Sequence, residues 1–344
     1  MKKILFICGS LNQTTQMHQI AKHLMKTYDC YFTHYYADGI EHAVAKMGWL
    51  NFTVLGGRHW RETDDYFKRN KLKVDPRGEG HEYDLVFTCS DLIVQKNIRN
   101  KRLILVQEGI TEPEGIVYQL VRWLGLPRYI ANTSTNGLSN AYDLFCVASE
   151  GYAEHFIRKG VRPEKIAVTG IPNFDHMLQF KQNDFPMHDY VLVATSPLRE
   201  TFRLDNRAVF IKRCVQIAGE RKLIFKLHPL ENAPRAIREI SKYAPEAMVF
   251  THGNVSHMIA NASTVITQQS TATFVAVALG KEVYTNLNLA ELKHLMPIQN
   301  GGTSATQIAQ LSLRLFHAPK REAQPQRVRS RGKARRTQAL PERP

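Results

Sequence analysis

Short apolar runs alternate along the chain with stretches whose apolar residues recur at helical spacing. The first run, residues 4–8, ends at Gly9 and Ser10, and the stretch after it places apolar side chains at Met17, Ile20, Ala21 and Leu24. An apolar run closed by a tight loop predicts a buried parallel strand, and the spacing after it predicts an amphipathic helix. A strand, a glycine loop and a helix form the first unit of a doubly wound sheet.

This alternation continues to about residue 170 and starts again at residue 190. Further strands are expected at 84–89, 101–106, 143–149 and 165–170, and later at 190–196, 222–227, 248–250, 264–267 and 282–285. Helices are expected at 151–159, 208–218, 234–243, 255–260, 272–279 and 304–317. Residues 179–189 are polar, contain Pro186 and have no periodicity, so they are expected to form a linker.

The pattern therefore predicts an α/β protein of two tandem Rossmann-like, doubly wound parallel-sheet domains, residues 1–180 and 188–317. Such domains face each other across a cleft at the carboxyl ends of their strands, where ligands bind in this architecture. The helix at 304–317 is placed to return and brace the first domain. One continuous sheet would contradict this prediction.

Composition excludes several classes of protein. With 43% hydrophobic and 22% charged residues in 344, the chain can bury a core and is not globally disordered. No apolar run reaches the ~18 residues that a membrane helix needs, so a cytoplasmic protein is expected. The five cysteines show no Cys-x-x-Cys spacing, which predicts buried, reduced thiols. No metal site is expected, because no Asp-x-Asp pair is present and His252 and His257 are poorly spaced.

Positive charge is concentrated at one end of the chain. The 46 basic and 31 acidic residues give a net charge of +15, and residues 320–344 carry nine basic and two acidic side chains. Almost no apolar residue accompanies them, so residues 318–344 are expected to be a disordered basic tail. An anionic membrane surface is the favoured partner of this tail, ahead of nucleic acid, and would place the protein peripherally at the inner membrane face. A solubilising tail without a partner is the alternative.

Candidate chemistry in the first domain lies in two loops that follow strands. The loop after the third predicted strand carries Glu108 and Glu112, and Glu108 is closer to the strand end, where a partly desolvated carboxylate can act as a general base. Glu112 is the second choice, with a place in the first turn of the next helix as its alternative. Around the first loop, an acceptor is expected to meet Gly9, Ser10 and His18. For His18, an ordinary position on the helix surface is the simpler interpretation.

In the second domain, polar side chains follow three strand ends. His228 closes one strand beside Pro229, which turns the chain and points the imidazole into the cleft, and Lys226 lies on the same side of that strand. A basic pair there suits the phosphates of a nucleotide, and a core histidine is the alternative. The other two loops supply further donor-binding candidates that can also serve as local caps, namely Ser196, Arg199, Ser270 and Thr271.

The helix expected after the loop of Glu108 and Glu112 has an unusually apolar stripe. Trp123, Arg122 and Arg128 lie near its end, and the stripe consists of Ile116, Val117, Leu120, Val121 and Leu124. A helix that faces the core explains the stripe and is favoured. Trp and Arg on an apolar helix also fit a contact with a membrane surface.

Four stretches resemble GT-B type glycosyltransferases. Residues 143–175 resemble the last strand, helix and strand of the amino-terminal domain in these enzymes. Residues 226–229, Lys-Leu-His-Pro, resemble the His-Pro motif of the bacterial capsule polysaccharide synthesis, sialyltransferase-like and CDP-glycerol glycerophosphotransferase group, in which the histidine contacts the donor phosphate. Residues 263–283 are similar to the donor-binding Ser-Thr segment of that group, and residues 107–109, Gln-Glu-Gly, to the motif that carries its general base. Gln107 replaces an acid of the motif, and Ala276 stands where many relatives have Glu.

The resemblance implies a metal-independent glycosyltransferase without a cofactor. Its donor is a nucleotide-activated sugar or polyol phosphate, and its acceptor is a surface glycan or a lipid-linked molecule. Glu108 would deprotonate the acceptor hydroxyl, and the donor phosphates would be neutralised by Lys226, His228, Ser270 and Thr271. One alternative is an enzyme like the non-hydrolysing UDP-sugar 2-epimerases, although their Asp-Ser-Gly-Gly segment is absent. The other is a non-catalytic protein that binds membrane or nucleic acid.

Overall fold

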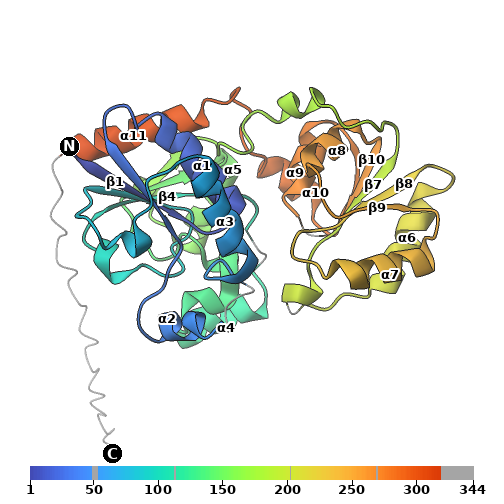
Figure 1. Cartoon of the computed structure of the whole chain (residues 1–344), viewed down its shortest axis with the longest axis horizontal. Helices are drawn as coiled ribbons and strands as arrows, with labels where there is room; N and C mark the ends of the chain where they lie inside the picture. Colours follow the sequence, from blue (N-terminus) through green and yellow to red (C-terminus); the bar gives the residue numbers. More distant parts are fainter. Residues whose placement is uncertain (49–52, 112–113, 202, 269, 319–344) are drawn as a thin grey trace, which may run out of the picture.

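The computed structural model in Figure 1 describes residues 1–48, 53–111, 114–201, 203–268 and 270–318. Within these residues the chain forms one parallel sheet of six strands and one of five. Successive side chains of each strand point to opposite faces, and both faces of both sheets are covered by helices. The predicted α/β fold with two Rossmann-like parallel-sheet domains is confirmed.

The first sheet has the strand order β2-β1-β3-β4-β5-β6. Its strands are β1 (Lys3–Cys8), β2 (Asp29–His34), β3 (Leu85–Thr88), β4 (Arg102–Val106), β5 (Leu144–Val147) and β6 (Ile166–Val168). One face packs on α1 (Leu11–Lys22), α3 (Gly57–Arg69) and α11 (Ser304–His317), and the other packs on α5 (Glu150–Lys159). Below this sheet in Figure 1 lie α2 (Gly39–Lys46) and α4 (Ile116–Leu124).

The second sheet has the strand order β11-β10-β7-β8-β9. Its strands are β7 (Val191–Ala194), β8 (Leu223–Lys226), β9 (Met248–Phe250), β10 (Thr264–Thr267) and β11 (Glu282–Tyr284). One face packs on α6 (Arg207–Ala218) and α7 (Ala233–Tyr243). The other packs on α8 (Val255–Asn261), α9 (Ala272–Ala278) and α10 (Leu289–His294).

Short 3-10 helices connect several of these elements. They are Pro76–Gly78, Lys96–Ile98, Arg128–Thr135, Pro163–Lys165, Met177–Lys181 and Arg199–Thr201. The segment Met177–Lys181 lies in the stretch between the two sheets, and Met177 is fully buried against α8 and α9. The connection between the sheets is therefore packed against the second sheet's helices.

Strand order reverses between β1 and β3 in the first sheet and between β7 and β10 in the second. Loops on either side of such a reversal diverge and leave room for a ligand at the carboxyl ends of the strands. The loops after β1 and β4 carry the first-domain candidates, and the loops after β7, β8 and β10 carry those of the second domain. The topology therefore groups the candidates of each domain at one edge of its sheet.

The two halves of the molecule share one apolar cluster. Tyr152 of α5 packs against Phe274 of α9 with ring centroids 6.4 Å apart, and both side chains are fully buried. The last helix, α11, leaves the second half and packs on α1, where Ile308 is buried and Phe316 meets Tyr28 edge-on. The expected return of this helix to the first domain is observed.

Some expectations were wrong or incomplete. The stripe of α4 was expected to face the core, but only Tyr118 and Val121 of this helix are buried. The sequence did not predict β2, α2, α3 or α10. All five cysteines are buried with free thiols, as predicted. Among the described residues, no helix is both long and apolar enough to cross a bilayer.

Candidate functional site

The carboxylate of Glu108 meets the first turn of α1. Ser10 Oγ and Asn12 Nδ2 donate to its Oε1 at 2.8 and 3.2 Å, and Gln13 Nε2 donates to its Oε2 at 2.6 Å. An ionised carboxylate, which only accepts, suits all three bonds, and the amino end of a helix favours negative charge. Within the described residues, no Lys or Arg forms an ion pair with Glu108, which is half-buried. Neutral donors therefore orient this charge without compensating it.

Gln107 directs the chain as it leaves β4. Its buried Nε2 donates to the Gly109 carbonyl at 2.9 Å, and its Oε1 accepts from the Ala148 N–H at 2.9 Å. An amide can donate in one bond and accept in the other, whereas an ionised acid would leave the Gly109 carbonyl without this donor. This dual role explains an amide at the position where the family resemblance implies an acid.

Gly9 and Ser10 form the turn that faces Glu108. Ser10 caps α1, since its Oγ accepts from the Gln13 N–H at 3.2 Å. Gly9 N–H donates to Gln13 Oε1 at 2.9 Å, and a Cβ at Gly9 would lie only 2.4 Å from that oxygen. The helix start that was expected to hold an anion or a hydroxyl therefore already faces the carboxylate of Glu108.

His18 and Glu112 do not join this group of residues. His18 is buried, with its Nδ1 3.0 Å from Tyr66 Oη and its ring edge-on to Phe32. Burial lowers the pKa of its imidazole. Its contacts are those of a core residue, so the simpler interpretation of a surface histidine was wrong. Glu112, the second-choice base, lies outside the described residues.

His228 lies directly beyond β8 with one ring nitrogen fixed. The Leu230 N–H donates to His228 Nδ1 at 3.1 Å, so the neutral ring carries its proton on Nε2. Burial, together with repulsion from His59, Lys226 and Arg58, lowers the pKa of His228 to about 4. The imidazole is therefore neutral near pH 7 and offers Nε2–H as a donor, which suits a phosphate oxygen.

The turn that carries His228 rests on Glu231. One oxygen of this buried carboxylate accepts from the His228 N–H at 2.9 Å and from the Thr195 hydroxyl. The other oxygen pairs with the buried guanidinium of Arg207, which also pairs with Asp205 at 3.0 Å. A buried charge of this kind is stable only when its partner is present. Glu231 follows His228 by three residues, but nothing in that spacing alone predicts its burial or its cation.

The remaining basic candidates of the second domain are engaged within the protein. Lys226 Nζ donates to the carbonyls of Leu227 and Thr251 at 2.9 and 3.3 Å, which leaves one of its three N–H bonds for a ligand. Burial and repulsion from Arg58 lower the pKa of Lys226. The guanidinium of Arg199 makes two bonds of 2.7 Å to Glu239.

Ser196 is buried under the turn that follows β7. Its carbonyl accepts from the Leu198 N–H at 2.9 Å and from Arg207 at 3.4 Å. Arg207 is the same cation that holds Glu231, so Ser196 and the His228 turn share one support. Ser196 and Arg199 therefore lie beside the framework of the His228 turn.

Gly109 and Thr271 bring the loops of the two domains into contact. A Cβ at Gly109 would lie 2.7 Å from Thr271 Cγ2, so any larger residue would require the Thr271 side chain or its loop to shift. Ser270 Oγ accepts from the Ala272 N–H at 3.2 Å, and its hydroxyl hydrogen can still donate. The loop of the candidate base and the loop of the candidate donor-phosphate site are therefore neighbours.

Arg58 and His59, which the sequence did not single out, approach the same loops from α3. Arg58 donates to the carbonyl of Pro229 and, through Nε, to Glu62 Oε1 at 2.6 Å. His59 is half-buried, and its Nδ1 has no hydrogen-bond partner among the described residues. Burial lowers the pKa of His59, while the charges of Glu62 and Glu108 oppose this effect. Because His59 also lowers the pKa of His228, it lies within electrostatic reach of both candidate residues.

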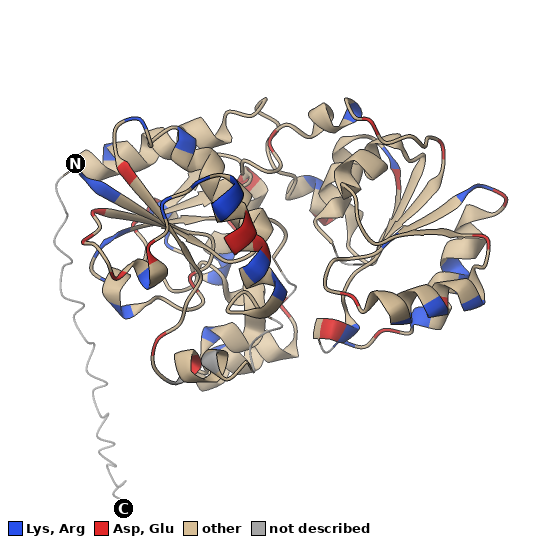
Figure 2. Ribbon diagram, in the orientation of Figure 1, with Lys and Arg blue, Asp and Glu red and all other residues tan. Residues whose placement is uncertain are grey.

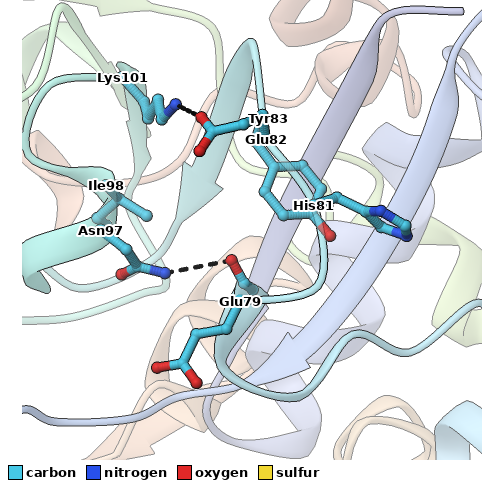
Figure 3. Close-up of a pocket in the computed structure, with 8 residues that line it drawn as sticks. Glu79, His81, Glu82, Tyr83, Asn97, Ile98 and Lys101 are labelled. Carbon is cyan, nitrogen blue, oxygen red and sulfur yellow. Dashed lines mark hydrogen bonds and ion pairs between the residues drawn. The ribbon is translucent and has the colours of Figure 1, made fainter.

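A separate hollow of about 170 Å³ lies at the opposite end of the first sheet (Figure 3). Its wall includes Glu82 paired with Lys101, and Asn97 donating to the Gly78 carbonyl at 3.2 Å. Glu82 and Lys101 precede their strands, whereas ligands of parallel sheets bind beyond the carboxyl ends. Neither this hollow nor the rest of the described residues gathers three His, Cys, Asp or Glu side chains able to hold a metal ion.

No protein-family model matches the chain, and no curated protein matches it in sequence. Solved structures match it over most of its length. A UDP-N-acetylglucosamine 2-epimerase matches with a TM-score of 0.54 at 14% identity, covering 94% of this chain and 99% of its own. The UDP-GlcNAc 2-epimerase from Neisseria meningitidis, bound to UDP-GlcNAc, matches with a TM-score of 0.53 at 12% identity, covering 91% and 100%. The wall teichoic acid polymerase TagF matches with a TM-score of 0.49 at 11% identity, covering 92% and 88%. The likeness to the two epimerases shows that this chain has the two-domain GT-B fold.

Proposed function

We propose that this protein is a transferase that moves a sugar, or a polyol phosphate, from a nucleotide-activated donor to an acceptor hydroxyl. The observation that carries the proposal is the contact between Gly109, beside Glu108, and Thr271 across the two domains. Group transfer requires a base on the acceptor side and a site for the leaving phosphate on the donor side. The two touching loops carry residues that we assign to these two roles.

In this proposal Glu108 receives the proton of the acceptor hydroxyl. The acceptor oxygen then bonds to the transferred carbon or phosphorus, and the bond between that atom and the nucleotide's phosphate oxygen breaks. The leaving phosphate keeps the electron pair. Its negative charge is met by Nε2–H of His228 and by the hydroxyls of Ser270 and Thr271, with the ammonium of Lys226 nearby. Donors fixed before the reaction stabilise such developing charge most effectively.

The surroundings of Glu108 suit this role. Its three donors are uncharged, so they hold the carboxylate in place while its negative charge still attracts the acceptor proton. Gly9 and Ser10 shape this acceptor-side turn. The acceptor class, a surface glycan or a lipid-linked molecule, follows from the family resemblance.

The donor half of the proposal is tested by ligand binding. Thermal unfolding is measured with UDP, CDP, CMP and GDP and their sugar or polyol conjugates, for wild type, His228→Ala and His188→Ala. His188 is exposed and precedes β7, at the other end of the same sheet, and is the matched control. One nucleotide should raise the melting temperature of wild type and of the control, because it binds the native state, but not that of His228→Ala.

The transfer half is tested with the nucleotide found in this way. Wild type should release it from its conjugate only when an acceptor is supplied. Conversion of the donor with no acceptor present would instead identify an epimerase. Binding of no nucleotide, or equal stabilisation of His228→Ala, would contradict the proposal.

A further inference from the structure

Helix α4 turns most of its apolar side chains to solvent. Ile116 and Trp123 are 81% and 82% exposed, and Val117, Leu120 and Leu124 are also exposed. Only Tyr118 and Val121 face inward, where they pack with Ala131. The fold therefore covers only part of the apolar surface of α4. We call the exposed residues the α4 surface: Ile116, Val117, Leu120, Trp123, Leu124 and Leu126.

A hollow of about 660 Å³ continues from the α4 surface. Leu126 belongs to both, and Leu138, which packs behind α4, also lines the hollow. Its other apolar walls include Leu92, Ile93 and Val94. Apolar surface thus extends from the helix into a recess large enough for part of a flexible apolar chain.

Cations lie along the edge of this apolar surface. Arg122 is on α4, and Lys96 and Arg99 line the hollow; all three are exposed. Within the part of the chain that the structure describes, no carboxylate forms an ion pair with any of the three.

Of the two acids that line the hollow, Asp38 has a cation as a partner and Glu41 has only a neutral hydrogen-bond donor. Asp38 accepts from the Lys96 N–H at 2.6 Å and pairs with Arg77 at 3.3 Å. Glu41 accepts from Tyr129 Oη at 3.3 Å. Among the described residues, the edge of the α4 surface therefore presents three cations that lack an ion-pair partner, against the single carboxylate of Glu41.

Other outer helices of the molecule look different. Figure 2 shows Lys and Arg along the outer faces of α6 and α7, as expected for helices that face water. An exposed apolar helix with Trp on its apolar side and Arg beside it has the composition of a helix that lies in a membrane interface. A second copy of the chain is a poorer occupant, because a two-fold contact would bring the cations of the edge close to their own copies.

We propose that the α4 surface docks on an anionic lipid surface, with the helix in the plane of the interface and its cations on the lipid headgroups. The net charge of +15 adds a general attraction to such a surface. The docking itself does not depend on the proposed function. One consequence rests on the proposed function: Ile116 follows Gly109 by seven residues, so docking brings the Glu108 loop close to lipid-linked acceptors.

The experiment is co-sedimentation of the full chain with vesicles of phosphatidylcholine, alone or mixed with phosphatidylglycerol. The test variant is Leu120→Gln with Trp123→Gln. The matched control is Leu204→Gln with Val209→Gln, two exposed apolar residues of the second domain. Wild type and control should bind the anionic vesicles, and the α4 variant should bind at least about tenfold more weakly. Arg99→Gln with Arg122→Gln should weaken binding to anionic vesicles only.

Tryptophan emission gives a second readout. Anionic vesicles should shift the emission of wild type to the blue, and Trp123→Phe should remove the shift. His228→Ala should bind vesicles as wild type does, so a failure of the nucleotide proposal leaves this result intact. Equal vesicle binding by the α4 variant and wild type would overturn the inference. So would a wild-type dimer that ignores vesicles and dissociates in the α4 variant, since the face would then join two proteins.

Discussion

Two glutamates at the carboxyl ends of the two sheets differ in what holds them. Glu108 in the first domain is half-buried and accepts from the uncharged side chains of Ser10, Asn12 and Gln13. Glu231 in the second domain is buried and accepts from the Thr195 hydroxyl, the His228 N–H and the guanidinium of Arg207. Both follow the end of a parallel strand, and the main difference is the cation.

The cation separates a framework role from a chemical one. A buried carboxylate paired with Arg207 has its charge compensated, so Glu231 can hold the His228 turn in a dry environment. A carboxylate met only by neutral donors keeps a charge that attracts a proton or a hydroxyl group, as general-base chemistry requires. Loss of Glu108 should therefore affect turnover, and loss of Glu231 should affect folding.

The largest effect is expected for Glu108→Gln. The amide keeps the size of the side chain but cannot take the acceptor proton, so transfer should slow by roughly 10²–10⁴-fold. The melting temperature should fall slightly, because the amide nitrogen cannot accept the hydrogen bond that one carboxylate oxygen receives. Initial rates with the identified donor and acceptor check this, with Glu82→Gln as the control because Glu82 is exposed at the other end of the sheet. A wild-type rate for Glu108→Gln would remove it as the base.

Glu231→Gln should instead lower the free energy of unfolding by up to about 3–5 kcal/mol, because the buried Arg207 loses one of its two counter-charges and keeps only Asp205. Urea unfolding at pH 7 measures this loss. Replacing Glu231, Arg207 and Asp205 together by apolar residues should recover part of the loss, since the whole cluster of buried charges is then removed. If Glu231→Gln is as stable as wild type while Glu108→Gln unfolds early, the assignment of the two roles is reversed.

Gly109→Ala tests whether the two loops must touch. Its Cβ would lie 2.7 Å from Thr271 Cγ2, and such overpacking costs about 1–3 kcal/mol. Nucleotide affinity should fall because the donor loop is displaced. Thr271→Ser removes the methyl group, so the double variant should recover much of the affinity in a double-mutant cycle. Gly115→Ala is the control, because a Cβ there meets nothing within 4 Å. Equal nucleotide affinity of Gly109→Ala and wild type would show that the contact is dispensable.

Much of this fold was predictable because the buried strands have locally continuous apolar runs. The ranges of β9, β10 and α11 agree with the expected 248–250, 264–267 and 304–317. The edge strand β2 was missed because its sequence, Asp-Cys-Tyr-Phe-Thr-His, mixes polar and apolar residues and only part of it is buried. The helix α3 was missed because only Thr63 and Phe67 of its thirteen residues are buried.

Only part of the candidate site could be predicted from the sequence. Glu108 and His228 stand beside strand ends, which are visible in the local sequence. Arg58 and Arg207 contact Pro229 and Glu231 in the His228 turn, and His59 lies within electrostatic reach of His228. These three residues come from helices elsewhere in the chain, and only the folded structure shows where they lie. The prediction that the apolar stripe of α4 faces the core was wrong for a related reason. An apolar stripe does not tell whether the protein itself or something outside it covers the helix.

The smallest effect is expected from a change in pH, and it concerns the contribution of His228 to stability. Burial lowers the pKa of His228 to about 4, below the 6.5 of an unperturbed imidazole. Between these values the unfolded chain binds more protons than the native protein, so stability falls as pH decreases from about 6.5 to 4. His228 contributes about 1–2 kcal/mol to this loss once its partial exposure is allowed for. His34 and His155, whose pKa values burial also lowers to about 4, add to the total. The measurement is therefore the difference between wild type and His228→Asn in urea unfolding at pH 7 and pH 5. The variant should lose less stability over this interval, whereas equal losses would show that the native protein leaves the imidazole free to take up a proton.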